Sequence, residues 1–230
     1  MKHSHWLSLL LLATFVSFVG LAATDVRGDG ELRRPLDLPS GGAGGDEDEE
    51  DAPETITFYG SDYEGDCFVW ALDRSGSMGW NGRWGVLQTE LSAAILSLSS
   101  MADFGVLFWS SNVITWQEQA VKATTSNKAA ANSWAMALTP DGWTCIAPGV
   151  VKALDINRTS HKHKKVVIVL SDGEPICNGT NIPDESLEAI NGANWDMQEI
   201  STIGVEVSGP GQTFLQQIAM ANQGTYTAAN

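Results

Sequence analysis

The sequence predicts an α/β domain in which a doubly wound, mostly parallel central sheet carries helices on both faces and one antiparallel edge strand. Residues 67–72 and 166–170 are short apolar runs, each ended by a polar, glycine-containing turn, which is typical of strands buried on both faces. Residues 83–101, between these runs, place apolar side chains at the spacing of a helix that faces a core. Strands that alternate with helices form parallel sheets with right-handed connections.

The remaining elements continue the same alternation. Residues 105–111 and 113–117 have the composition of strands, and Asn112 between them indicates a hairpin. In chain order we then expect helices over residues 126–138 and 145–156, a strand over 200–207, a last helix over 213–222 and a short edge strand over 225–227.

The first 54 residues are predicted to lie outside this domain. Residues 1–23 combine the basic Lys2 with an apolar stretch and terminal small residues, which is the pattern of a secretory signal peptide. An uncleaved membrane anchor is the alternative, because about 20 apolar residues suffice to cross a bilayer. Residues 24–54 are rich in glycine and acidic residues, which predicts a disordered linker. We therefore expect a secreted or extracytoplasmic protein, without a membrane span after signal cleavage, whose folded domain covers residues 55–230.

The charge of the chain argues against nucleic acid as a partner. The net charge is −15, and residues 56–230 hold 17 acidic and 9 basic residues, so the predicted domain is itself acidic. Binding to phosphates requires clustered Lys and Arg. The one basic cluster, residues 161–165, precedes a predicted strand and is expected at the end of the sheet opposite the candidate site, as a solvated loop or a contact to an anionic surface.

Oxygen-bearing side chains follow the predicted strands. Asp73, Ser75 and Ser77 come directly after the first strand, Asp172 ends the later one, and Thr144 follows a turn between them. Ligands of open α/β sheets bind outside the carboxyl ends of the strands, where these residues would meet. The Asp-x-Ser-x-Ser run alone is equally typical of a turn that caps a helix. As metal ligands, its carboxylate and two hydroxyls would suit a hard divalent cation such as Mg²⁺, with Mn²⁺ or Ca²⁺ as alternatives.

These five residues resemble the metal-ion-dependent adhesion site (MIDAS) of von Willebrand factor type A (VWA) domains, and the resemblance extends over about residues 55–230. It implies that Ser75, Ser77 and Thr144 approach the metal directly or through water, and that Asp73 and Asp172 act largely through bound water. It also implies a non-catalytic, adhesion-type module. Such a module docks an acidic side chain of a protein ligand on the metal.

The sequence provides little for catalysis. A serine nucleophile needs a base within hydrogen-bond reach, and the four histidines lie in the signal segment or before the strand that leads to Asp172, namely His3, His5, His161 and His163. We therefore expect that the protein is not an enzyme. Two alternatives stay open, a structural envelope module with a stabilising metal site and a metal-dependent hydrolase.

Cysteines and tryptophans surround the predicted site. Cys145 and Cys177 both fall on its side of the sheet, which favours a disulfide between them, with three reduced cysteines as the alternative. Cys67 is expected to be a buried free thiol. Trp80 and Trp143 lie near the metal-site residues and are candidates for an exposed ligand-contact rim, because tryptophan is enriched in binding hot spots.

Overall fold

The structure, a computed structural model, describes residues 53–229. Within this part of the chain, the central layer is a seven-stranded sheet in which five strands run parallel. The predicted α/β fold class is confirmed. The strands, in spatial order, are β11 (Gln223–Ala229), β10 (Glu199–Val205), β7 (Lys165–Ser171), β3 (Cys67–Asp73), β4 (Asp103–Trp109) and β5 (Val113–Thr115), with β6 (Val121–Lys122) also paired to β4.

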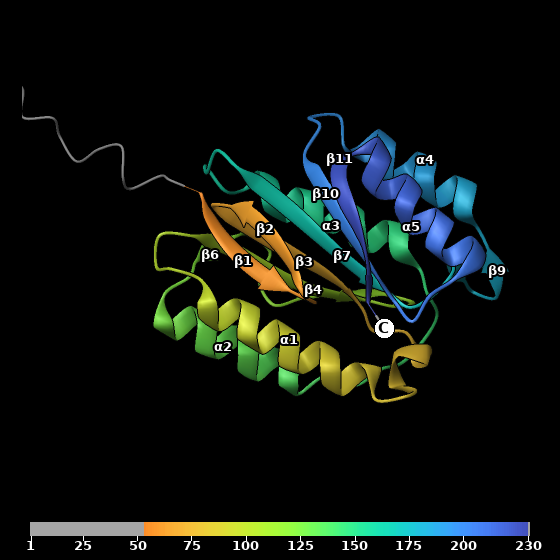
Figure 1. Ribbon diagram of the computed structural model, residues 1–230, viewed down its shortest axis with the longest axis horizontal. Coiled ribbons are helices and arrows are strands. Elements are labelled where there is room, and N and C mark those ends of the chain that lie inside the picture. The colour runs from red at the N-terminus through yellow and green to blue at the C-terminus, as the bar shows by residue number, and fades with distance from the viewer. Residues whose placement is uncertain (1–52, 230) are drawn as a thin grey trace, which may run out of the picture. The chain divides into compact units, whose positions relative to one another are not determined.

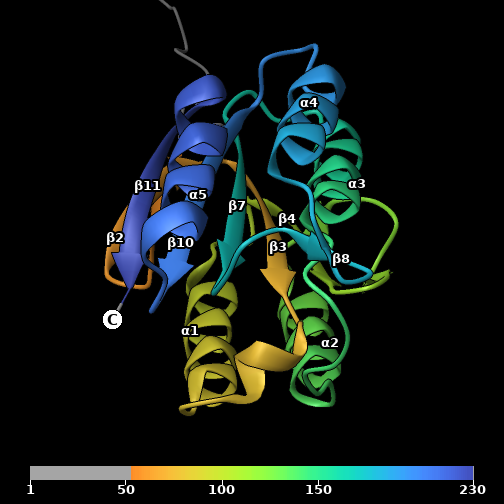
Figure 2. The ribbon, with the colours of Figure 1, turned by 90° about the vertical axis from the view of Figure 1, so that its right-hand side faces the viewer.

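Helices cover both faces of this sheet. Figures 1 and 2 show α1 and α2 on one face and α3, α4 and α5 on the other. The alternation of side chains along a strand explains the arrangement, since Trp70 faces the core that includes α1 and α2, and its neighbours Val69 and Ala71 face the core that includes α3. The bounds are α1 (Arg83–Ser97), α2 (Thr125–Met136), α3 (Ile146–Arg158), α4 (Pro183–Ala193), α5 (Gly209–Ala221) and the short 3-10 helix η1 (Gly76–Gly79).

The strands at the two edges of the sheet run in different directions relative to their neighbours. β5 and β6 both run antiparallel to β4, so the expected antiparallel edge strand has a short second partner. At the other edge, β11 runs parallel to β10. The edge strand expected over residues 225–227 is thus present and longer than predicted.

Several elements were not predicted. A hairpin of β1 (Glu54–Phe58) and β2 (Ser61–Gly65) packs its apolar side chains into the same core as α1. Its turn is formed by Tyr59 and Gly60, both with positive φ, and tyrosine is an unusual residue for this conformation. Helix α4 and the small hairpin of β8 (Ile176–Cys177) and β9 (Thr180–Asn181) were also missed.

Helix α1 is shorter than the predicted range of residues 83–101. It ends at Ser97 because Leu98 adopts an extended ψ of 138°. The backbone N–H of Ser99 then donates to the carboxylate of Glu54, which ties the end of the helix to the start of β1. Apolar spacing alone does not reveal such a stop.

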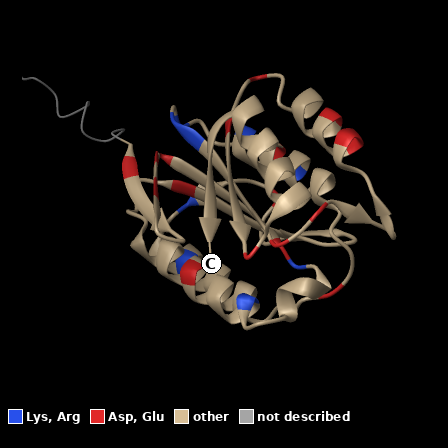
Figure 3. Ribbon diagram, turned by 45° about the vertical axis from the view of Figure 1, so that its right-hand side comes forward, with Lys and Arg blue, Asp and Glu red and all other residues tan. Residues whose placement is uncertain are grey.

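Two predicted segments lie outside the described residues. These are the signal peptide at residues 1–23 and all but the last two residues of the linker at 24–54. Over residues 53–229, the structure has no helix with the length and apolar character needed to cross a membrane. Charged residues are scattered over the described domain rather than gathered on one face (Figure 3).

Candidate functional site

Asp73 is the last residue of β3 and lies beside the carboxyl end of β7. The parallel register pairs Leu72 with Leu170, which places Asp73 next to Ser171. Its Oδ1 accepts the backbone N–H of Ser75 at 2.7 Å, and its Oδ2 accepts the Ser171 hydroxyl at 2.6 Å. The side chain is completely buried. The fold therefore fixes this carboxylate in one orientation at the edge of the sheet.

The environment of Asp73 favours a positive charge nearby. Burial, followed by the charge of Asp172, raises the pKa of Asp73 to about 7, although hydrogen bonds from Ser171 and Ser75 act in the opposite direction. A buried carboxylate beside a second one is costly without a compensating cation. A cation bound beside Asp73 would therefore stabilise its charged form.

Three further oxygens form a continuous chain beside Asp73. The Ser75 and Ser77 hydroxyls are 3.1 Å apart, and the Ser77 hydroxyl donates to Asp172 Oδ1 at 2.9 Å. Ser75 is buried and Asp172 is only 8% exposed. The loop after β3 and the loop after β7 therefore bring four of the five predicted residues together.

Thr144, the fifth predicted residue, lies on a neighbouring loop. This loop contacts the others through the Gly142 carbonyl, which accepts the Gly76 N–H at 3.1 Å. The backbone N–H of Thr144 donates to the Ile176 carbonyl at 2.8 Å. Among the described residues, no hydrogen bond joins the Thr144 hydroxyl to the other four. The structure thus places its backbone next to the cluster without a direct side-chain link.

The loop that carries Thr144 is fixed covalently and by an arginine. A disulfide joins Cys145 to Cys177, the pair named from the sequence, and Cys67 is a buried free cysteine. Arg74 donates to the Thr139 carbonyl at 3.0 Å and to the Ser110 hydroxyl at 3.2 Å. These links attach the loops after β3, β4 and α2 to one another. The role of Arg74 could not be predicted from its position in the sequence.

Arg83 is the functional residue that sequence reasoning missed most clearly. It opens α1, and its Nη1 donates to Asp172 Oδ2 at 2.5 Å while its Nε donates to Glu206 Oε2 at 2.8 Å. Its isolation in the sequence is a usable signal, because it is the only Lys or Arg between Arg74 and Lys122. A single positive charge at the start of a largely apolar helix, six residues after Ser77, indicates an acidic partner near the site.

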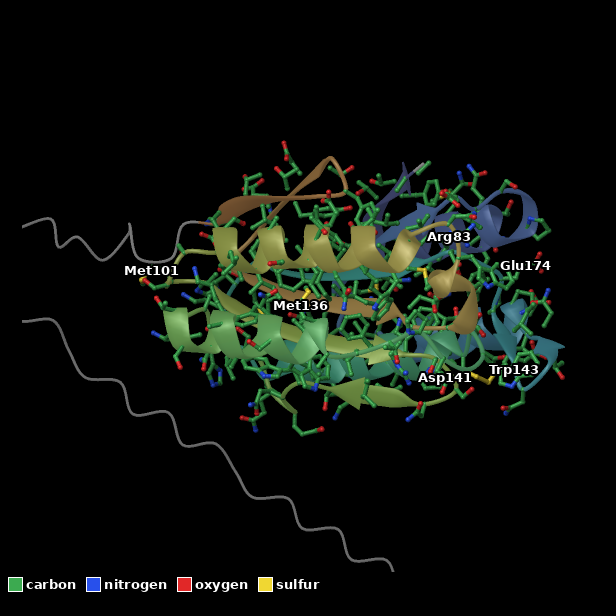
Figure 4. The ribbon with its side chains drawn as sticks, turned by 90° about the horizontal axis from the view of Figure 1, so that it is seen from below. Arg83, Met101, Met136, Asp141, Trp143 and Glu174 are labelled. Carbon is green, nitrogen blue, oxygen red and sulfur yellow. A yellow bond between two sulfur atoms is a disulfide. The ribbon has the colours of Figure 1, made fainter. Side chains whose placement is uncertain are left out.

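Exposed apolar side chains lie on the loops that carry the predicted site residues. Trp80 is 66% exposed, Trp143 is 48% exposed and Ile176 is 37% exposed. Figure 4 shows Arg83, Asp141, Trp143 and Glu174 at one end of the domain and Met101 at the other. By contrast, Trp109 is fully buried. The two tryptophans of the predicted rim are therefore both accessible to a partner.

The donor set fits a hard divalent cation. It consists of two carboxylates and hydroxyl groups, all oxygen donors that Mg²⁺, Mn²⁺ and Ca²⁺ accept. Within residues 53–229, no group of three or more His, Cys, Asp or Glu side chains is placed to hold a metal. A cation at this site would therefore depend on serine hydroxyls and water in addition to Asp73 and Asp172.

Comparison with known proteins identifies a family. A family model described as von Willebrand factor type A domain matches residues 68–228. Inter-alpha-trypsin inhibitor heavy chain H4 of Bos taurus is 29% identical over 167 residues, which cover 68% of this chain and 18% of the bovine protein. The chain therefore spans less than a fifth of that relative's length.

Solved structures share the fold. A von Willebrand factor type A structure from Catenulispora acidiphila has a TM-score of 0.64 at 22% identity, covering 72% of this chain and 39% of the other. The pilus adhesin SpaC from Lactobacillus rhamnosus GG has a TM-score of 0.61 at 18% identity, covering 71% and 28%. BatB from Bacteroides thetaiotaomicron has a TM-score of 0.54 at 18% identity, covering 72% and 91%.

Proposed function

This chain belongs to the von Willebrand factor type A domain family, and on this premise we propose that it is an exported protein-binding module that docks an acidic ligand through a divalent metal ion. The family supports a protein-interaction module in general. The metal, the acidic ligand and export are our inferences. The observation that carries them is the oxygen cluster of Asp73, Ser75, Ser77 and Asp172 at the carboxyl edge of the sheet.

The cluster suits docking because much of its donor set is neutral. Ser75, Ser77 and Thr144 would hold the metal with water, while Asp73 and Asp172 would supply the negative charge. A divalent ion bound partly by neutral donors keeps affinity for a further carboxylate. The chain's own contribution is to fix the hydroxyls, since Ser75 is buried and held through its N–H by Asp73.

The surface around the cluster supports a protein ligand. Trp80 and Trp143 expose large apolar area next to the polar site. Tryptophan contributes strongly to protein interfaces because it buries much area with few rotatable bonds. We therefore propose a partner that presents an acidic side chain beside apolar residues. Mg²⁺ is the preferred ion, with Mn²⁺ or Ca²⁺ as alternatives.

Two other functions are weaker. A structural envelope module with a purely stabilising metal site would not need exposed tryptophans around the metal. A metal-dependent hydrolase would need a positioned general base. His161 and His163 precede β7, at the edge of the sheet opposite Asp172. We favour docking for these reasons, and we propose an extracellular or envelope location.

Metal titration tests the proposal. We expect Mg²⁺ or Mn²⁺ to release heat in calorimetry and to stabilise the purified protein by about 2.7 kcal/mol at a hundredfold excess over the dissociation constant. Asp73→Asn should abolish both effects. Asp66→Asn is the matched control, because Asp66 is also buried and directly precedes β3, at the strand's opposite end. The proposal fails if wild-type protein shows neither heat nor stabilisation.

A second experiment separates docking from a structural role. Partners captured from extracytoplasmic extract by wild-type protein should be released by a chelator and should not be captured by Asp73→Asn. Partner capture that neither the chelator nor Asp73→Asn reduces would contradict metal-mediated docking. Metal-dependent turnover of ester or peptide libraries would instead support the hydrolase.

A further inference from the structure

Arg83 places a permanent positive charge next to Asp172, a residue of the proposed metal site. Its Nη1 lies 2.5 Å from Asp172 Oδ2, and the two side chains are 13% and 0% exposed. A guanidinium remains charged at every relevant pH. Burial opposes this charge, but hydrogen bonds to Glu206 and Asp172 raise the pKa of Arg83. The ion pair is therefore a fixed feature of the folded domain.

Asp172 is shared between two neighbours. Its Oδ1 accepts the Ser77 hydroxyl at 2.9 Å, and its Oδ2 accepts Arg83. One carboxylate thus faces the oxygen cluster with one atom and a cation with the other. The part of the Asp172 charge that Arg83 neutralises no longer attracts a metal ion.

Arg83 is in turn shared with Glu206. Its Nε donates to Glu206 Oε2 at 2.8 Å, and the same oxygen accepts Asn81 Nδ2 at 3.2 Å. Glu206 follows β10, so it reaches Arg83 from a different loop than Asp172 does. Its side chain is 37% exposed. The arginine therefore divides its charge between a buried carboxylate at the site and a more accessible one outside it.

We propose that Arg83 is an internal counter-cation that competes with the divalent ion for Asp172, and that Glu206 moderates this competition by engaging the same guanidinium. The inference rests on the metal site proposed above. It assigns to the Arg83–Glu206 pair the task of setting the site's metal affinity. Both are positioning residues, since they act through Asp172.

The two partners of this ion pair have opposite predicted effects. Arg83→Met removes a positive charge next to the site, so metal should bind about tenfold more tightly. Glu206→Gln removes the competing negative charge and strengthens the ion pair of Arg83 with Asp172, so metal should bind several-fold more weakly. A purely structural ion pair would behave differently. Loss of either partner would then disturb the site and weaken metal binding in both variants.

Calorimetric titration of the full chain with Mg²⁺ and Mn²⁺ tests this inference. Arg83→Lys keeps the charge and should bind metal as wild type does. Arg158→Met is the matched control, because Arg158 also forms ion pairs, with Asp155 and Asp196, at the opposite end of α3 from the site. Its metal affinity should equal that of wild type. Thermal unfolding of each variant verifies that it is folded.

The outcomes separate this inference from the proposed function. Absence of metal binding in wild type and in all variants overturns the proposed site itself. Metal binding by wild type with unchanged or weaker binding by Arg83→Met overturns the counter-cation role alone. Should Arg83→Met fail to fold, Glu206→Gln decides, since affinity equal to or above that of wild type contradicts the competition.

Discussion

Gly149 lets α3 approach the sheet more closely than any residue with a side chain would. A Cβ atom at this position would lie 2.4 Å from Cγ and 2.5 Å from Cδ1 of Trp109. Trp109 is fully buried, so its indole ring has no free space to move into. Gly149→Ala should therefore force a shift of the helix or of the ring.

The expected destabilisation follows from two opposing terms. Overpacking of a core typically costs about 1–3 kcal/mol, and the clash here involves rigid ring atoms. Replacing glycine by alanine inside a helix returns up to about 1 kcal/mol. We expect a net loss of about 1–2 kcal/mol. For a domain of this size, that loss lowers the melting temperature by about 2–8 °C.

Gly85 provides the matched control. It lies in α1, is exposed, and a Cβ atom there would meet nothing within 4 Å. Gly85→Ala should therefore stabilise the protein by about 0.4–1 kcal/mol. Urea unfolding followed by circular dichroism measures both variants. A Gly149→Ala protein as stable as wild type, with the expected gain in Gly85→Ala, would refute the close-packing argument.

Three other predictions concern the surroundings of the site. Cys145→Ser together with Cys177→Ser should lower the free energy of unfolding by about 3–4 kcal/mol, because the disulfide closes a loop with a sequence separation of 32; an equal midpoint and slope in urea for the double variant and the oxidised wild type would contradict this. Trp80→Ala and Trp143→Ala should leave metal affinity and the melting temperature nearly unchanged but weaken partner capture, since both side chains are exposed; undiminished capture would remove them from the interface. In metal-free protein, the free energy of unfolding should fall by up to a few kcal/mol as pH rises from 4 to 7. The reason is that folding raises the pKa of Asp73 to about 7, so over this range the folded state holds a proton that the unfolded chain has released. Asp73→Asn should remove this part of the pH dependence of stability, and the same pH dependence in Asp73→Asn as in wild type would contradict the role of Asp73.

The strands that build the site were predictable because each is a short, β-branched or aromatic apolar run that ends in a polar turn. The runs in β3 and β7 are apolar at every position and end in polar residues, as expected for central parallel strands. Parallel strands bring their carboxyl ends to the same edge of a sheet, so both aspartates were expected at that edge. The pairing of β3 with β7 then places them side by side. The sequence pattern thus predicted the fold class, and the von Willebrand resemblance supplied the strand order and the expectation that the site residues lie together.

The features that the sequence did not predict depend on contacts between residues far apart in the chain. The β1–β2 hairpin turns at Tyr59 and Gly60, and Tyr59 tolerates its positive φ while its N–H donates to Glu90, 31 residues away. The Arg83 ion pairs join residues 89 and 123 positions apart. Such pairings leave no local periodicity in the sequence. The position of the Thr144 hydroxyl, which forms no hydrogen bond to the other four site residues in the described part of the chain, likewise depends on loop conformation.

Asp73, Ser75, Ser77 and Asp172 are proposed to form a divalent metal site. Crystals of the protein grown with Mn²⁺ test it most directly through the anomalous scattering of the metal. We expect one strong anomalous peak within coordination distance of the Ser75 and Ser77 hydroxyls, and we expect this peak to be absent in crystals of Asp73→Asn. A map without a peak at this edge of the sheet, or with Mn²⁺ bound only to acidic residues elsewhere on the domain, would contradict it.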